Sequence, residues 1–138
     1  MEYPKLTVDS VVMDMNKGLL LVKRKNDPEK GKWALPGGFV NYNEDPADAA
    51  AREVKEETGL SVELMDPMNA KVFGEPGRDA RGHIVTLVYM AQPSPSRGEL
   101  KAGDDAEDAR FFSEDEYSKM KNEVAFDHVR IIEEALGW

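Results

Sequence analysis

The chain has 138 residues, of which 41% are hydrophobic and 33% are charged, and its formal net charge is −9. These values indicate a globular domain and exclude a disordered chain or a membrane protein. The negative charge argues against binding nucleic acid or anionic membranes through bulk electrostatics, so an anionic substrate needs local help from metal ions and a few arginines. The chain has no cysteine, which excludes disulfides, thiolate catalysis and cysteine zinc sites.

The N-terminus and the hydropathy of the chain predict where the protein resides. The first ten residues lack the basic start and apolar core of a signal peptide, and no apolar run approaches the ~18 residues of a membrane span. The absence of cysteine is compatible with a reducing compartment. We therefore expect a cytoplasmic protein that forms a single domain over residues 1–138.

The first part of the chain predicts a β-hairpin. Two β-prone runs, residues 6–13 and 19–22, are separated by turn residues. The second run is apolar throughout, which is typical of a strand covered on both faces. Residues 23–32 are polar and contain proline and glycine, so we expect them to form a loop.

A glycine pair comes next, followed by a helix. A short strand is predicted to end in a turn at Gly37 and Gly38, where the backbone can approach a ligand or metal closely. Asp45 is a suitable N-cap for a helix that starts at Pro46 and ends before Gly59. Apolar residues at helical spacing predict close packing of this helix against a sheet. They are Ala47, Ala50, Ala51 and Val54.

The second half of the chain alternates short strands with loops and ends in helices. Strands are predicted at residues 62–64, 71–73, 83–91 and 109–112, with loops at 74–82 and 92–108. Ser113 and Glu116 form a capping box that starts a short helix. Asp127 can cap a last helix that ends at Gly137. Its expected inward residues are Val129, Ile132 and Leu136. Such irregular interleaving favours a mixed sheet with helices on both faces.

Three carboxylates lie close together near the end of the first predicted helix, at Glu53, Glu56 and Glu57. Positions three and four apart share a helix face, so these charges repel one another unless a cation sits among them. The helix macrodipole also disfavours carboxylates at a C-terminus, by roughly a few tenths of a kcal/mol each. Oxygen-rich clusters suit Mg²⁺ or Mn²⁺, and we predict a metal site here; the alternative is a solvated acidic face.

The segment around these carboxylates matches a known pattern. Its specified positions are Gly38, Glu44, Arg52, Glu53, Val54, Glu56, Glu57, Gly59 and Leu60. This spacing resembles the Nudix box, and the flanking sequence extends the likeness over most of the chain. The resemblance implies an α/β fold, an α/β/α sandwich with a mixed, partly antiparallel sheet. It also implies a hydrolase that cleaves a nucleoside diphosphate linked to another moiety and uses Mg²⁺ or Mn²⁺.

The resemblance further implies roles for the residues of the box. Two or more ions would be held by a backbone carbonyl of Gly37 or Gly38 and by the carboxylates of Glu53, Glu56 and Glu57. Arg52 would orient the carboxylates, and Glu44 would assist the substrate through water. The ions would neutralise the diphosphate and lower the pKa of a water that attacks phosphorus in line.

The general base of the family usually lies outside the box, on a loop that differs between members. Here an acidic run, residues 104–108, precedes a predicted strand. Asp105 is the first candidate for the base, followed by Glu107 and Asp104. The alternative is a plain acidic surface loop.

The substrate is indicated by a segment outside the box. Pro76 lies sixteen positions beyond Leu60, and a proline near that spacing resembles the ADP-ribose pyrophosphatases. Residues 77–83 and 125–128 also resemble bacterial and archaeal members of that group, whose products are AMP and ribose 5-phosphate. Two alternatives stay open. One is hydrolysis of oxidised nucleoside triphosphates by a mutator-type enzyme; the other is ADP-ribose sensing without cleavage, against which the intact carboxylate set argues.

Arginines are the main candidates for contacts with the substrate. Arg78 and Arg81 lie in a predicted loop, and Arg24 follows an apolar strand, so each is either a phosphate or ribose contact or a solvated charge. His83 heads a strand and is more often a packed or surface histidine than a catalytic base. Aromatic residues at strand positions are usually core, although three are candidates for stacking on adenine: Trp33, Phe73 and Tyr89. Since many family members pair, we expect a homodimer.

Overall fold

Strands and helices interleave along the chain in the computed structural model, which describes residues 1–138. The strands are β1 (Lys5–Asp14), β2 (Gly18–Arg24), β3 (Trp33–Ala34), β4 (Gly37–Phe39), β5 (Val62–Met65), β6 (Lys71–Phe73), β7 (Ile84–Pro93) and β8 (Ala106–Phe112). The helices are α1 (Pro46–Thr58), α2 (Glu114–Met120) and α3 (His128–Leu136), with short 3₁₀ turns η1 (Pro67–Asn69) and η2 (Lys121–Glu123). None of these helices has the length and apolar character needed to span a bilayer.

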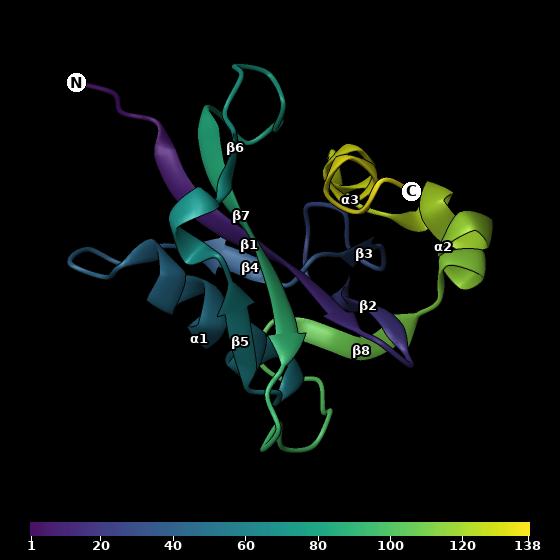
Figure 1. The fold of residues 1–138 in the computed structure, drawn as a ribbon. Helices are drawn as coiled ribbons and strands as arrows, with labels where there is room; N and C mark the ends of the chain where they lie inside the picture. The colour runs from purple at the N-terminus through teal and green to yellow at the C-terminus, as the bar shows by residue number, and fades with distance from the viewer.

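The strands form one mixed sheet that is built around β1 (Figure 1). β1 pairs in parallel with β7 over residues 5–12, and on its other side residues 7–9 pair antiparallel with β4. The predicted hairpin with β2 is confirmed, but it pairs only Met13 and Asp14 of β1. β2 then carries β3 and β8, while β5 and β6 pair with β7. β4 therefore pairs with the first half of β1, and β2 pairs with its last two residues.

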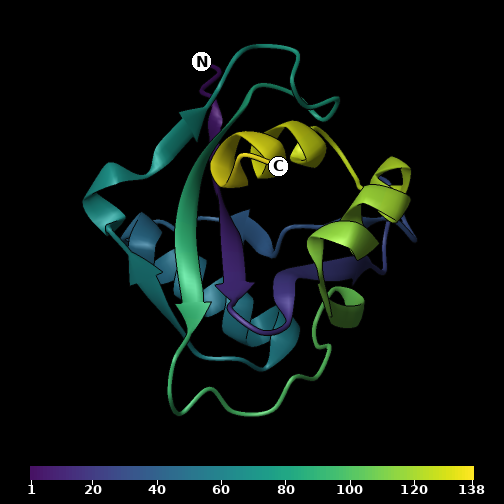
Figure 2. The same cartoon turned by 45° about the vertical axis from the view of Figure 1, so that its right-hand side comes forward.

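Helices cover both faces of the sheet (Figures 1 and 2). α1 packs on one face, where Val54 lies in a cluster with Val12 of β1. α3 packs on the other face, where Ile132 joins the largest apolar cluster together with Val11 of β1. Neighbouring residues of β1 thus point to opposite layers, as the two-residue period of a strand requires. This arrangement confirms the predicted α/β/α sandwich with a mixed sheet.

α1 begins and ends where the sequence predicts. The Asp45 carboxylate accepts a hydrogen bond of 2.9 Å from the Ala47 N–H, and Pro46 is the first helical residue. Gly59 ends the helix with a φ of 76°, a left-handed conformation that favours glycine. A side chain there would also collide with the loop after β7, since a Cβ would lie 2.6 Å from the carbonyl oxygen of Glu99.

The buried stripe of α1 differs slightly from its prediction. Ala50 and Val54 are fully buried as expected, and Ala49 joins them, whereas Ala47 and Ala51 are only half-buried. The sheet therefore contacts the helix on a face rotated toward Ala49. Because two of the residues at this contact are alanines, the helix axis can approach the sheet closely.

The predicted turn at Gly37 and Gly38 is wrong, because these residues form β4 and pair with β1. Their lack of side chains serves close packing. A Cβ on Gly37 would overlap the carbonyl oxygen of Val8, and a Cβ on Gly38 would lie 2.7 Å from the carboxyl carbon of Glu53. The glycine pair thus allows α1 and β1 to pack closely against β4.

The predicted loops are longer than the observed ones. β2 continues to Arg24 instead of ending at residue 22, and β8 begins at Ala106 instead of residue 109. Asp108 pairs with Lys23 across these two strands, so Glu107 lies in a strand and not in a loop. Cross-strand pairing outweighs the low strand propensity of the acidic residues.

The start of α3 also differs from its prediction. Asp127 occupies the N-cap position but makes no capping hydrogen bond, because its carboxylate binds Arg78 instead. Ile131 is fully buried, whereas Val129 and Leu136 are only partly buried. The buried face of α3 is therefore rotated relative to the predicted stripe. At α2 the predicted capping box is confirmed.

Candidate functional site

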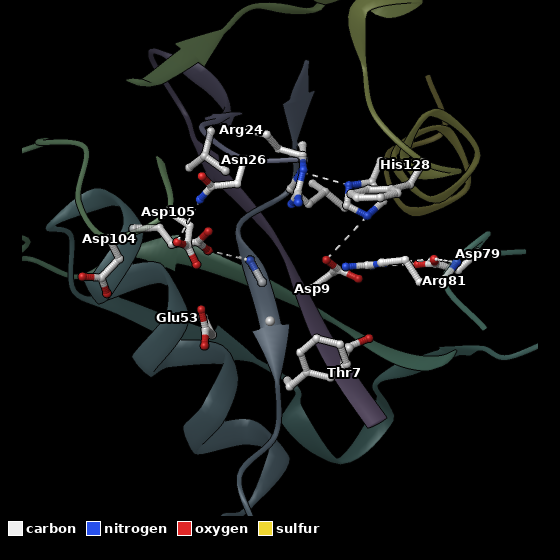
Figure 3. Close-up of a pocket in the computed structure, with 18 of the residues that line it drawn as sticks. Thr7, Asp9, Arg24, Asn26, Glu53, Asp79, Arg81, Asp104, Asp105 and His128 are labelled. Carbon is white, nitrogen blue, oxygen red and sulfur yellow. Dashed lines mark hydrogen bonds and ion pairs between the residues drawn. The ribbon is translucent and has the colours of Figure 1, made fainter. Parts of the chain in front are cut away.

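A pocket of about 440 Å³ lies between the first half of β1, the end of β2 and the C-terminal part of α1 (Figure 3). Strands β3 and β4, the start of α3 and several loops complete its wall. It brings together ten of the residues predicted for the site: Arg24, Gly37, Gly38, Glu53, Glu56, Glu57, Arg78, Arg81, Asp104 and Asp105. Segments that are distant in sequence thus meet at one cavity.

The other residues singled out from the sequence do not line this pocket. Pro76 is exposed on its loop, and Glu107 is exposed on β8. The ring of His83 contacts the carbonyl oxygen of Gly74 at 2.9 Å, outside the pocket. Arg52, on α1, and Glu44, just before α1, lie beside the pocket. The three aromatic candidates for stacking, Trp33, Phe73 and Tyr89, are buried in the core.

Glu57 is a largely buried carboxylate in this pocket. Its Oε1 accepts a hydrogen bond of 2.8 Å from the N–H of Gly37. The pKa of Glu57 is raised from 4.5 to about 8, first by burial and then by the charges of Glu53, Asp9 and Asp105, against the opposing effect of that hydrogen bond. The charged form of Glu57 is therefore disfavoured unless a cation lies beside it.

Arg52 connects the acidic residues of the box. It donates to Glu44 at 2.7 and 2.9 Å, to Glu53 at 2.7 Å and to Glu56 at 3.1 Å. These bonds raise the pKa of Arg52, with Glu44 making the largest contribution. Burial nevertheless raises the pKa of Glu53, because it outweighs the effect of the guanidinium. This geometry fits the predicted orienting role of Arg52, which stays a prediction.

The donor set fits a hard divalent cation. No group of three carboxylates or imidazoles lies close enough here to enclose an ion, since Arg52 holds Glu53 and Glu56. Glu53 and Glu57 nevertheless face the same pocket as the backbone of β4, and the pKa of each carboxyl is raised by burial and by neighbouring charge. Cations with oxygen ligands, such as Mg²⁺ or Mn²⁺, would relieve that repulsion. Glu56 would join them on release from Arg52.

The loop that carries Asp105 is fastened to the end of α1. The N–H of Gly103 donates to the carbonyl oxygen of Glu57 at 3.1 Å, and a Cβ on Gly103 would lie 2.7 Å from the carbonyl oxygen of Glu56. The side chain of Asn26 donates to Asp105 Oδ1 at 3.3 Å. Asp105 is thus held at the acidic end of the pocket from two sides.

Basic and aromatic residues also line the pocket. The guanidinium carbons of Arg24 and Arg81 lie 4.9 and 4.8 Å from the centroid of the Phe126 ring. Burial, and then the charge of Arg81, lowers the pKa of Arg24. Arg81 is also held by Asp79, at 2.7 and 3.0 Å. Two cations beside one ring form a place where an anionic group would be bound.

Arg78 lines the pocket, but its guanidinium is bonded to other residues of the protein. Its side chain is 5% exposed and donates two hydrogen bonds to Asp127, at 2.8 and 2.9 Å. A third bond, of 3.2 Å, goes to the carbonyl oxygen of Ile84. Arg78 therefore ties the loop before β7 to the start of α3, and its hydrogen bonds are used within the protein.

Twelve of the 22 lining residues were not predicted as site residues, among them Thr7, Asp9, Asn26, Phe126 and His128. Thr7 and Asp9 alternate with apolar residues in β1, and such polar residues on a buried face were a signal in the sequence. The segment of Phe126 and His128 was noted only for its family resemblance. Asn26 gave no signal, because a polar residue in a polar loop is ordinary.

Comparison with known proteins decides the family. The model of the NUDIX domain matches residues 4–135 of the chain. The chain belongs to the NUDIX family. An ADP-ribose pyrophosphatase of Methanocaldococcus jannaschii is 43% identical over 136 residues, which are 99% of this NUDIX chain and 75% of the relative.

Solved structures of NUDIX proteins share the fold. A bifunctional NMN adenylyltransferase/ADP ribose pyrophosphatase from Francisella tularensis, complexed with AMP and a Mn ion, matches with a TM-score of 0.84 at 34% identity. The match covers 99% of this chain and 42% of that protein, so this chain spans less than half of its length. The NUDIX domain of Shewanella oneidensis NrtR, crystallised with ADP ribose, matches with a TM-score of 0.78 at 29% identity, covering 98% of this chain and 88% of that one.

The burial of Glu57 predicts how the stability of the metal-free protein depends on pH. Because its pKa is raised from 4.5 to about 8 in the folded state, the folded protein binds more protons between these values. The contribution of Glu57 to the free energy of unfolding should therefore fall as pH rises from about 5 to 8, by at most about 1.4 kcal/mol per pH unit. Thermal unfolding in EDTA measures this slope. Glu57→Gln should flatten it, and a slope unchanged by that substitution would contradict the assignment.

The environment of Arg78 predicts a role in stability. Arg78→Ala leaves the Asp127 carboxylate without its main partner, and we expect it to lower the free energy of unfolding by roughly 3 kcal/mol. Arg130→Ala is the matched control, because Arg130 also contacts Asp127 but is 41% exposed. It should cost less than about 1 kcal/mol. Urea unfolding measures both values, and equal losses would argue against a structural role for Arg78.

Proposed function

We propose that this protein hydrolyses the diphosphate bond of ADP-ribose, in the presence of Mg²⁺ or Mn²⁺, and releases AMP and ribose 5-phosphate. The observation that carries the proposal is one pocket that holds the carboxylates of Glu53 and Glu57 together with the guanidinium groups of Arg24 and Arg81. The identity of 43% to an ADP-ribose pyrophosphatase supports this choice of substrate. The homodimer expected from the family resemblance stays a prediction.

The residues of the pocket have different roles in the proposed reaction. Glu53 and Glu57 would hold the cations with the backbone of β4, Arg52 would position Glu53, and Glu56 would join them on release from Arg52. When bound, the cations would neutralise the diphosphate and make a water nucleophilic. Arg24 and Arg81 bind oxygens of the diphosphate.

Asp105 is the proposed general base. It lies at the acidic end, where Asn26 fixes one of its oxygens and leaves the other free to accept a proton from the attacking water. Glu107, the second candidate from the sequence, points from β8 without reaching the pocket. The geometry therefore favours Asp105 over Glu107.

Activity on a panel of substrates tests the proposed function. The protein with Mg²⁺ is mixed with ADP-ribose, ADP-sugars, dinucleotides and oxidised and ordinary deoxynucleoside triphosphates. We expect the highest kcat/KM with ADP-ribose and the release of AMP, and no activity in EDTA. Fastest release of pyrophosphate from a triphosphate would favour the mutator-type alternative. Binding of ADP-ribose without any cleavage would favour the sensor alternative; the Shewanella NrtR domain was crystallised with that ligand.

Substitution of Asp105 and of Glu107 tests which residue is the general base. Asp105→Asn should lower kcat about 10²-fold, because general-base catalysis contributes at least that factor. Glu107→Gln is the matched control and should leave kcat within about twofold, since Glu107 does not line the pocket. Steady-state hydrolysis of ADP-ribose measures both. A merely twofold loss in Asp105→Asn would remove this residue from the chemistry.

A further inference from the structure

Asp9 presents a buried carboxylate to the pocket that the proposed chemistry does not use. It lies in β1 on the same face as Thr7, and the residue is 8% exposed. Both side chains line the pocket. In Figure 3 Asp9 lies between the acidic side, with Glu53 and Asp105, and the side with Arg81. Asp9 therefore lies between the acidic residues of the pocket and Arg81.

Only one oxygen of Asp9 accepts a hydrogen bond within the protein. Oδ2 accepts a hydrogen bond of 2.6 Å from the hydroxyl of Thr86. The other oxygen, Oδ1, lies 3.6 Å from Nε2 of His128, which is longer than a hydrogen bond. The N–H of Leu35 donates to Nδ1 of that ring at 3.0 Å, so Nε2 carries the proton of the neutral imidazole. The carboxylate is held on one side and open on the other.

An acceptor in this position favours hydroxyl groups and disfavours phosphate. Buried polar atoms normally have hydrogen-bond partners, and a carboxylate oxygen needs a donor. A sugar hydroxyl is such a donor, whereas a phosphate group brings like charge and no proton to give. Thr7, two residues before Asp9 on the same face, adds a hydroxyl that can donate or accept. The floor of the pocket therefore suits a ring with several hydroxyls.

We propose that Asp9, held by Thr86 and assisted by Thr7, accepts hydrogen bonds from the hydroxyls of a pentose attached to the diphosphate. Asp9 thereby selects sugar-linked diphosphates against nucleoside triphosphates, whose additional phosphate it repels. This inference rests on the proposed function, because it names the residue that recognises the sugar in the same pocket. A site built to hydrogen-bond a hydroxyl rejects analogues that lack it.

Calorimetric binding in EDTA tests the proposal without requiring turnover. The ligands are ADP-ribose, an analogue without hydroxyls on the terminal pentose, and an analogue without the 2′- and 3′-hydroxyls of the adenosine. The wild-type protein should bind one of the two analogues about 10- to 100-fold more weakly than ADP-ribose. Asp9→Asn should weaken ADP-ribose binding by a similar factor but change the affinity for that analogue by less than about threefold.

A matched control separates recognition from general damage. Asp14→Asn also removes a buried carboxylate from β1, but Asp14 binds Arg97 and does not line the pocket. It should leave all three affinities within about threefold. If Asp9→Asn does not fold, equal affinities of the wild-type protein for the three ligands still overturn the proposal.

The outcomes distinguish this inference from the proposed function. Equal wild-type affinities for all three ligands, or an equal loss for all three in Asp9→Asn, would overturn the role of Asp9. Hydrolysis of ADP-ribose by the wild-type protein with Mg²⁺ is measured in parallel. Hydrolysis without hydroxyl-selective binding leaves the proposed function standing and refutes the inference. Hydroxyl-selective binding without hydrolysis leaves the role of Asp9 standing and refutes the proposed function.

Discussion

The burial of Glu57 against the amide of Gly37 is the constraint on which the site depends. A carboxylate can be buried here because α1 lies close to the sheet, with Ala49 and Ala50 at the contact. The glycine pair of β4 leaves room for the carboxylates, and the loop at Gly103 closes over the end of the helix. The packing that stabilises the fold thus also concentrates negative charge, which favours binding of a cation.

The positively charged residues of the pocket come from other parts of the chain. Arg24 comes from the end of β2, Arg81 from the loop before β7, and both lie against Phe126 beside α3. In a protein with a net charge of −9, this local positive region allows an anionic ligand to approach the acidic end. Asp9 lies between the two ends, so the pocket alternates in sign along its length, as a sugar diphosphate with bound cations does.

Much of the site was predictable because it lies on one helix. The cap at Asp45, the end at Gly59 and the three carboxylates follow from spacing within a short segment. Arg78 and Arg81 looked alike in the sequence, and both line the pocket, but Arg78 is buried in its contact with Asp127, whereas Arg81 is partly exposed. Their difference depends on partners that are far away in the chain.

The sequence by itself determined the family, the metal-suited carboxylates and the mixed α/β architecture, since these depend on local periodicity and fixed spacing. Only the tertiary structure decided that Asp9 faces the same pocket as Glu57, that Asp105 rather than Glu107 reaches it, and that β4 is a strand. The physical reason is the pairing of β1 with both β7 and β4. That register sets which side chains of β1 meet α3 and the pocket, and no short stretch of sequence encodes it.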